Sequence, residues 1–139
     1  MRHEDWQNRF WNEMKACDGV SFEYGSHDCI LFAAKLADAI SVDGRYVDRA
    51  KMAFQWDDTR TAASLLQEHR LQELIETVLG SMRRWQELQH GDLVLMLHDN
   101  GRGMEQTLGV HDGVQVMVPA ARGLTPLWWN EALGGWRIE

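Results

Sequence analysis

The hydrophobic periodicity of this chain changes near Gln89, and that change limits the folds it can adopt. Before this point, apolar residues recur at the spacing of one face of an α-helix. After it, short apolar runs are separated by Gly-Asp, Asp-Gly and proline-containing segments, which are typical of short β-strands and turns. The order predicts an α+β domain, with N-terminal helices packed on a small antiparallel β-sheet.

Helical segments are expected over most of the first part. Residues 5–16 repeat apolar side chains at helical spacing. Residues 30–40 form a strongly apolar helix, whose N-terminus can be capped by Ser26 or Asp28. Residues 59–79 form one broken helix or two short ones, closed by a glycine cap.

Strands are expected in the second part. Residues 91–99 have the pattern of a buried strand, and residues 106–118 form two strands joined at Asp112-Gly113, a dipeptide typical of tight hairpins. A loop over residues 119–126, which contains both prolines, leads through a short helix into a terminal strand over residues 134–139.

Size and composition exclude several classes of protein. The 139 residues suffice for a single domain over residues 1–139 that needs no disulfide and no structural metal. A net charge of −7 argues against a nucleic-acid partner, because phosphate neutralisation drives that binding. The chain starts without the apolar segment of a secretory signal, and no run is long enough to cross a membrane. We therefore expect folding in a cytosol, no cofactor and no membrane contact.

Cys29 is the strongest candidate for chemistry. It begins the apolar helix, where the helix dipole and free backbone N–H groups stabilise a thiolate and can form an oxyanion hole. The alternative is that a cysteine at the head of an apolar helix is a small buried side chain. Cys17, near the end of the first helix, is expected to be a structural thiol.

Three histidine–aspartate dipeptides invite comparison with a metal centre. They are His27-Asp28, His98-Asp99 and His111-Asp112. Metal ligands must converge and need supporting hydrogen bonds, and nothing in the spacing of these dipeptides makes them converge. We expect no metal site, with the first dipeptide in a turn and the others at strand ends.

Several short motifs occur in a fixed order along the chain. An aromatic-Gly segment precedes Asp28-Cys29, a Gly91-Asp92 step opens a strand, and Leu108-Gly-Val precedes a Gly113 turn. In this order the chain resembles the NlpC/P60 superfamily of papain-like thiol hydrolases, and more closely its small tail-cluster proteins of phages and prophages. The matching residues are Tyr24, Gly25, Asp28, Cys29, Phe32, Ala34, Gly91, Asp92, Leu108, Gly109, Val110, Gly113, Gly123, Leu124, Trp136 and Arg137.

The resemblance implies a papain-like fold in which Cys29 is the nucleophile and acts on cell-wall peptides. Asp28 and Tyr24 are candidates to support the oxyanion. The alternative for Tyr24, which we slightly favour, is that its ring packs under the loop. The oxyanion tyrosine of the peptidases would fall near Phe22, which has no hydroxyl.

The resemblance also places the base of the peptidases at Thr107, and a threonine cannot accept the proton of a thiol. His111 lies on the same face of the strand but about 13 Å further along, so it can serve as the base only after a local rearrangement. His98 and His27 are alternatives to it. The remaining alternative is that the fold is kept and the chemistry is lost.

Trp128 and Trp129 are adjacent, so both side chains cannot face inward on a helix or strand. Exposed aromatic pairs often mark binding surfaces, and we expect a partner site here. The alternative is that one ring covers the edge of the sheet.

Two functions follow from these features. The first is a thiol hydrolase, with Cys29 as nucleophile and His111 as base, that opens peptidoglycan for a phage tail. The second is a catalytically inactive structural or tail-assembly module, which the acidic charge balance favours because wall polymers are largely anionic. A cytosolic binding protein unrelated to phages is a third alternative. The expected partners are phage tail proteins or peptidoglycan peptides. The expected location is the bacterial cytoplasm during synthesis and the virion after assembly.

Overall fold

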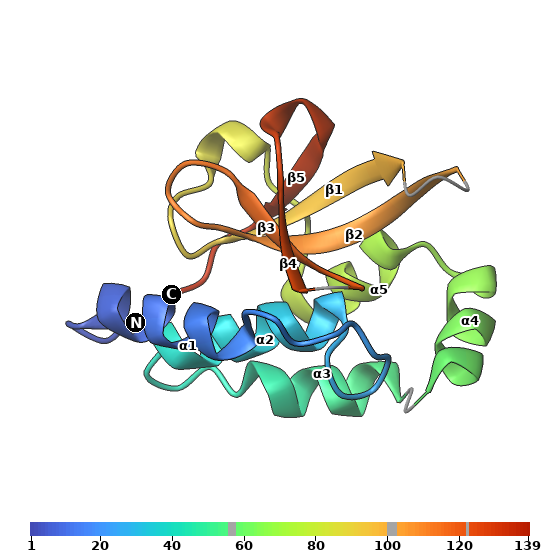
Figure 1. Cartoon of the computed structure of the whole chain (residues 1–139), viewed down its shortest axis with the longest axis horizontal. Coiled ribbons are helices and arrows are strands. Elements are labelled where there is room, and N and C mark those ends of the chain that lie inside the picture. Colours follow the sequence, from blue (N-terminus) through green and yellow to red (C-terminus); the bar gives the residue numbers. More distant parts are fainter. Residues whose placement is uncertain (56–57, 100–102, 122) are drawn as a thin grey trace.

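A computed structural model describes residues 1–55, 58–99, 103–121 and 123–139. A layer of helices lies on one side of a five-stranded antiparallel sheet (Figure 1), which confirms the α+β prediction. The helices are α1 (Trp6–Cys17), α2 (Cys29–Ile40), α3 (Tyr46–Phe54), α4 (Thr59–Glu68) and α5 (Leu71–Leu79), with short 3₁₀ helices η1 (Trp85–Glu87) and η2 (Trp129–Glu131). The strands are β1 (Leu93–Asp99), β2 (Met104–His111), β3 (Val116–Ala120), β4 (Gly123–Leu127) and β5 (Ala132–Trp136).

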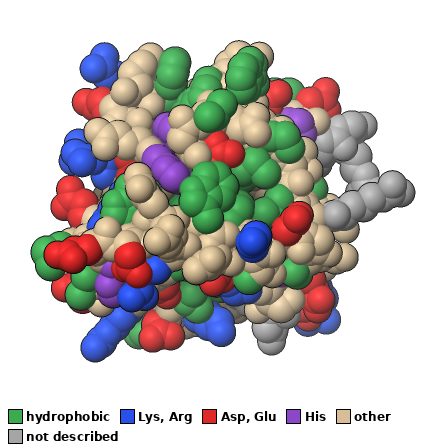
Figure 2. Space-filling view, turned by 60° about the vertical axis from the view of Figure 1, so that its left-hand side comes forward, with side chains coloured by type: hydrophobic (Ala, Val, Ile, Leu, Met, Phe, Trp, Pro, Cys, Tyr) green, Lys and Arg blue, Asp and Glu red, His purple; other side chains and the backbone are tan. Residues whose placement is uncertain are grey.

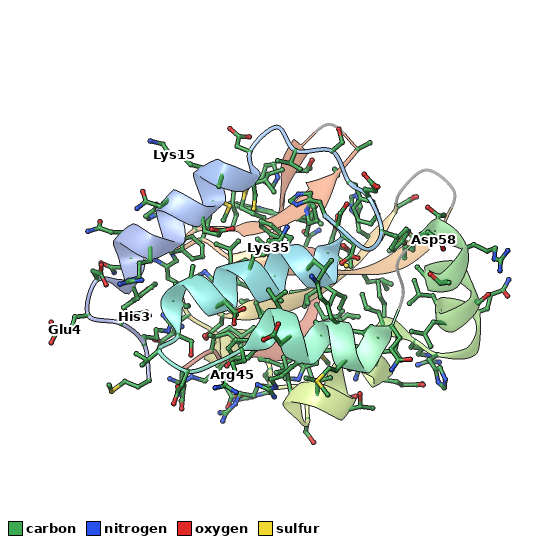
Figure 3. The ribbon with its side chains drawn as sticks, turned by 90° about the horizontal axis from the view of Figure 1, so that it is seen from below. His3, Glu4, Lys15, Lys35, Arg45 and Asp58 are labelled. Carbon is green, nitrogen blue, oxygen red and sulfur yellow. The ribbon has the colours of Figure 1, made fainter. Side chains whose placement is uncertain are left out.

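Helix α2 is the centre of the molecule. Nine of its twelve residues are buried, because its sequence is apolar around most of its circumference. It lies between α1 and α3 (Figure 3) and packs against β2. The main core therefore forms where α2 meets the sheet, with Phe10 of α1, Phe32 of α2 and Leu95 of β1 fully buried in it.

The strand order is β4-β3-β2-β1-β5. The predicted hairpin is confirmed: β2 and β3 pair through Val110↔Met117 and His111↔Val116, on either side of Asp112-Gly113. Strands β2 and β3 approach closely at Gly109. A β-carbon there would lie 2.5 Å from Val116 and 2.8 Å from the carbonyl oxygen of Met117, so only glycine fits.

The sheet is covered on its other face by a smaller core. Val94 and Met96 of β1 pack there with Val116, Val118, Leu127 and Leu88. Trp129 and Ala132 lie against this cluster, so the segments that carry η1 and η2 form its cover. Their position places two tryptophan-bearing segments side by side on the outside of the sheet.

The loop predicted over residues 119–126 is wrong for residues 119–120 and 123–126, which lie in strands, and residue 122 lies outside the described residues. Pro119 lies in β3 and pairs with Leu124, and Pro126 lies in β4 and pairs with Met117. Strand β4 is an edge strand, and edge strands tolerate a residue without an N–H. A terminal strand is present, as predicted, but it spans Ala132–Trp136 rather than residues 134–139.

Helix α3 has no counterpart among the predicted elements. It begins after Arg45, a non-glycine residue with φ 52°, and its own N-cap makes no side-chain hydrogen bond. The carboxylate of Asp38, on α2, accepts the N–H groups of Tyr46 (2.5 Å) and Val47 (3.1 Å) instead. The cap is thus supplied by another helix. Residues 59–79 form two helices, as one of the two alternatives predicted, and Gly80 closes the second at φ 85°.

The two ends of the chain lie side by side (Figure 1). Arg2 donates to the carbonyl oxygens of Ile138 (2.8 Å) and His90 (2.7 Å) and to Oδ1 of the buried Asp92 (2.9 Å). Ser41 donates to the carbonyl oxygen of Glu139 at 2.7 Å. Among the residues placed by the structure, no helix has the length and apolar character needed to cross a membrane.

Candidate functional site

The turn before α2 is organised by Asp28. Its side chain is fully buried, and its Oδ1 accepts the N–H of Leu31 at 2.8 Å, which caps the helix as predicted. Its Oδ2 accepts the N–H of Gly25 at 3.0 Å. Gly25 has φ 89°, a value that favours glycine, so the Tyr-Gly step allows the chain to turn back toward the helix.

The Cys29 thiol lies beneath this turn and is 8% exposed. The N–H of Leu108, the hydroxyl of Thr107 and the N–H of Ile30 lie beside the sulfur and act to lower its pKa. Burial acts in the opposite direction and outweighs them, since a thiolate loses its hydration in an apolar site. The net result raises the pKa of Cys29 to about 11, so the thiol is protonated at neutral pH.

Tyr24 belongs to the same site. Its ring meets Phe22 edge-on with 4.9 Å between centroids. Burial, followed by the charges of Cys29, Glu105 and Asp28, raises the pKa of Tyr24 to about 12. The structure therefore brings Asp28, Tyr24 and Cys29 together, and the phenol of Tyr24 keeps its proton.

The structure does not bring His111 to Cys29. Thr107 lies beside the sulfur, and His111 follows four residues later at the far end of β2, about 13 Å along the strand. The charged groups that act on His111 are Asp92, His90 and Asp112. No histidine is among the groups that shift the pKa of Cys29.

The two alternative bases have other surroundings. His98 forms a hydrogen bond with Glu131 of η2, with 2.9 Å between Nδ1 and Oε2. His27 is 4% exposed in the turn, as predicted, and its Nε2 has no hydrogen-bond partner. Burial lowers the pKa of His27, with a further contribution from Lys35. Over the described ranges, no three histidine, cysteine or acidic side chains come together in a way that could hold a metal ion.

A second group of side chains lies on the outer face of the sheet. Trp129 stacks on Trp85 with 5.4 Å between centroids, and its ring also meets His111 at 4.7 Å. Its Nε1–H donates to the carbonyl oxygen of Val114 at 3.0 Å. Trp128 is 61% exposed and Trp85 is 37% exposed. We call the group formed by Trp85, His111, Val114, Trp128 and Trp129 the aromatic surface.

Figure 2 shows histidine side chains beside hydrophobic ones on the face that carries the chain ends. The ring of His90 is surrounded by three aromatic rings. The distances between ring centroids are 5.0 Å to Trp6, 4.5 Å to Phe10 and 5.5 Å to Trp11. Its Nε2 is buried and has no hydrogen-bond partner. Burial, the largest cause, and the charge of Arg2 lower the pKa of His90, although Asp112 acts against them.

Sequence reasoning identified Trp128 and Trp129 but missed Trp85 and the place of His111 beside them. Trp85 carries no local signal, because its partner Trp129 is distant in sequence. The Asp112-Gly113 pair predicts the hairpin turn that follows His111. It does not predict that the ring of Trp129 packs against His111. Arg2 was also missed, since its three acceptors lie near the other end of the chain.

The model of one protein family, described as a domain of unknown function (DUF6950), matches residues 1–138. Comparison with curated proteins and with solved structures found no match.

Proposed function

From the geometry of the thiol site and the resemblance of its motifs, we propose that this chain, which belongs to the DUF6950 family of unknown function, is a non-catalytic module of a phage or prophage tail, with an NlpC/P60-like fold and no thiol hydrolase activity. The observation that carries this proposal is that a hydroxyl, that of Thr107, faces the buried thiol of Cys29. In the resembling peptidases this position supplies the histidine base.

The chemistry of the thiol supports an inactive site. A cysteine nucleophile attacks as a thiolate, which an adjacent imidazole generates. Among the described residues, no imidazole contributes to the pKa shift of Cys29, and burial raises this pKa to about 11. The hydroxyl of Thr107 can donate a hydrogen bond but cannot take up the thiol proton at neutral pH. The site retains the helix start and the N–H groups of a thiol hydrolase without its base.

The aromatic surface supports a role in assembly. Tryptophan is enriched at the centres of protein interfaces, and Trp128 exposes most of its ring. The segment over residues 85–139 is acidic, which favours a tail protein with a basic surface as the partner. Residues 85–139 contain seven acidic side chains, at 87, 92, 99, 105, 112, 131 and 139, against three basic ones, at 102, 122 and 137.

The inactive site is tested by the reactivity of the thiol. A shift of the pKa from 9.0 to about 11 leaves about a hundredfold less thiolate near neutral pH, so iodoacetamide should label Cys29 at least that much more slowly than an unfolded thiol. Labelling is read by mass spectrometry of the folded protein. Faster labelling of Cys29 than of Cys17 would overturn the proposal in favour of a hydrolase.

The position of the missing base is tested by Thr107→His. An imidazole placed beside the sulfur should lower the pKa of Cys29 and increase its labelling rate by at least about tenfold at pH 7. Met104→His is the control, because Met104 is exposed on the opposite face of β2. Equal rates in the two variants would show that position 107 is not the base position.

The partner site is tested by Trp128→Ala. The purified protein is mixed with each purified protein of a phage tail in turn, and affinity is measured by calorimetry. Loss of a central tryptophan should weaken binding at least about thirtyfold while the fold is retained. Trp11→Ala, which removes a 45% exposed ring from α1, should bind normally. Unchanged affinity of the Trp128 variant, or binding to none of the tail proteins, would count against the assembly role.

A further inference from the structure

The turn between β2 and β3 is held by side chains at both of its ends. Nδ1 of His111 accepts the N–H of Gly113 at 2.9 Å. Oδ1 of Asp112 accepts the N–H groups of Val114 (2.9 Å) and Gln115 (2.8 Å). The carbonyl oxygen of Val114 in turn accepts the indole N–H of Trp129. One short turn therefore connects the imidazole of His111 to the indole of Trp129 in the aromatic surface.

The hydrogen bond from Gly113 determines the protonation state of His111. A backbone N–H can only donate, so Nδ1 must offer its lone pair, and the neutral ring carries its proton on Nε2. A proton added to the ring would occupy Nδ1. The two N–H groups would then face each other, and the bond to Gly113 would be lost. The turn thus requires a neutral His111.

Three titratable groups act electrostatically on His111. Asp92 and Asp112 are the carboxylates that face it, and His90 is the neighbouring base. His90 is in turn faced by Arg2 and Asp112. Asp92 already bonds to Arg2, and Oδ1 of Asp112 is occupied by the turn. Burial is the largest cause that lowers the pKa of His111, and His90 adds to it against the two carboxylates.

We propose that His111 is a proton-sensitive latch of the aromatic surface: the neutral imidazole holds the β2–β3 turn and Trp129 in place, and a proton on Nδ1 releases both. The two contacts of Trp129, with the ring of His111 and with the carbonyl oxygen of Val114, transmit the change. Regulation of partner binding by this latch rests on the proposed assembly function. The latch itself is a property of the isolated chain.

The latch is tested by a titration of the isotopically labelled protein, followed by NMR from pH 8 to pH 5. At pH 8 the ring nitrogens of His111 should report the tautomer with its proton on Nε2. The Gly113 amide and the Trp129 indole N–H should then shift together with the imidazole, with one midpoint below 6.5. A proton on Nδ1 at pH 8, or a Gly113 amide that does not follow His111, would overturn the proposal.

Two variants separate the latch from general effects of acid. His111→Phe keeps a ring against Trp129 but can neither accept the N–H nor titrate, so the indole shift should disappear. His69→Gln removes an exposed histidine of the helical half and should leave that shift intact. An indole shift that persists in the Phe variant would overturn the latch.

Partner affinity distinguishes the latch from the proposed function. A tail protein that binds at pH 8 should bind about three- to tenfold more weakly below the midpoint, the change expected for one net hydrogen bond. That pH dependence should be absent from His111→Phe. Failure of every tail protein to bind at pH 8 would remove the assembly function, while the NMR titration would still decide the latch.

Discussion

The carboxylate of Asp28 bonds both to the turn before α2 and to the first turn of α2, and these two segments position Cys29. Both of its oxygens accept backbone N–H groups, and the side chain has no exposure to water. Asp28→Ala should lower the free energy of unfolding by about 2–3 kcal/mol, because it removes a helix cap and leaves buried N–H groups without an acceptor. Urea denaturation measures the change.

The matched control is Asp58→Ala, which removes the exposed cap of α4. Its cost should be about 1 kcal/mol, since water can replace the lost acceptor. An Asp28 variant that loses no more stability than the Asp58 variant would contradict the role assigned to the buried carboxylate. The cap at Asp28 was predictable because its acceptor and donors are neighbours in sequence. The position of Thr107 beside the sulfur was available only through the resemblance, because it joins residues that are distant in the chain.

At the scale of elements, α3 depends on a cap from its neighbour. Asp38→Ala should lower the free energy of unfolding by about 1–2 kcal/mol and should increase amide exchange at Tyr46 and Val47, because both N–H groups lose their acceptor. Hydrogen exchange read by mass spectrometry locates the effect. Asp43→Ala, an exposed change in the same connection, should leave α3 protected. Equal exchange in both variants would show that α3 does not need this cap.

The cap that Asp38 supplies to α3 explains why this helix could not be predicted from the sequence, while other elements could. Helices α1 and α2 were found because an apolar face repeats along each of them. Helix α3 is short, and the residue that caps it lies in another helix, so no local signal marks its start. The end of β3 and the whole of β4 were obscured by their prolines, although the start of β3 was predicted as part of the hairpin. Pro119 is tolerated because the pairing between β2 and β3 covers Val116 and Met117 of β3 and ends before the proline.

For the whole molecule, three histidines should make the free energy of unfolding decrease as the pH falls. Burial, the largest cause in each case, lowers the pKa values of His27, His90 and His111. Below pH 6.5 the unfolded chain takes up protons that the folded chain resists, so stability is complete above this pH and is lost as the pH falls through the folded values. The midpoint of urea unfolding should therefore be constant from pH 8 to pH 7 and should decrease from pH 6.5 to pH 5.5.

His27 should contribute to this dependence, because the residue is 4% exposed and its Nε2 has no partner. A group protonated only in the unfolded chain changes stability by up to about 1.4 kcal/mol for each pH unit. His27→Gln should reduce the decrease below pH 6.5, whereas the exposed His69→Gln should not. A wild-type midpoint that stays constant to pH 5.5 would contradict this account.

The candidate site shows the same division between local and distant information. The sequence places a cysteine at a helix start, and the structure places it there, but burial decides its protonation, and burial depends on the packed fold. From the sequence, His111 was considered as a base for Cys29 and as a possible metal ligand, but not as a partner of Trp129. Its contacts with Gly113 and Trp129 form where a hairpin turn meets η2, and no spacing in the sequence reveals them.

The adjacent chain ends have a consequence for connectivity. Arg2 bonds to the carbonyl oxygen of Ile138, and Ser41 bonds to that of Glu139, so the start and the finish of the chain meet beside the end of α2. A few linking residues would close the polypeptide into a ring without moving any strand of the sheet. A circular permutant opened in the exposed segment at Gly80–Ser81 would keep both the thiol site and the tryptophan-bearing face, and the domain could equally be inserted within a loop of a larger protein.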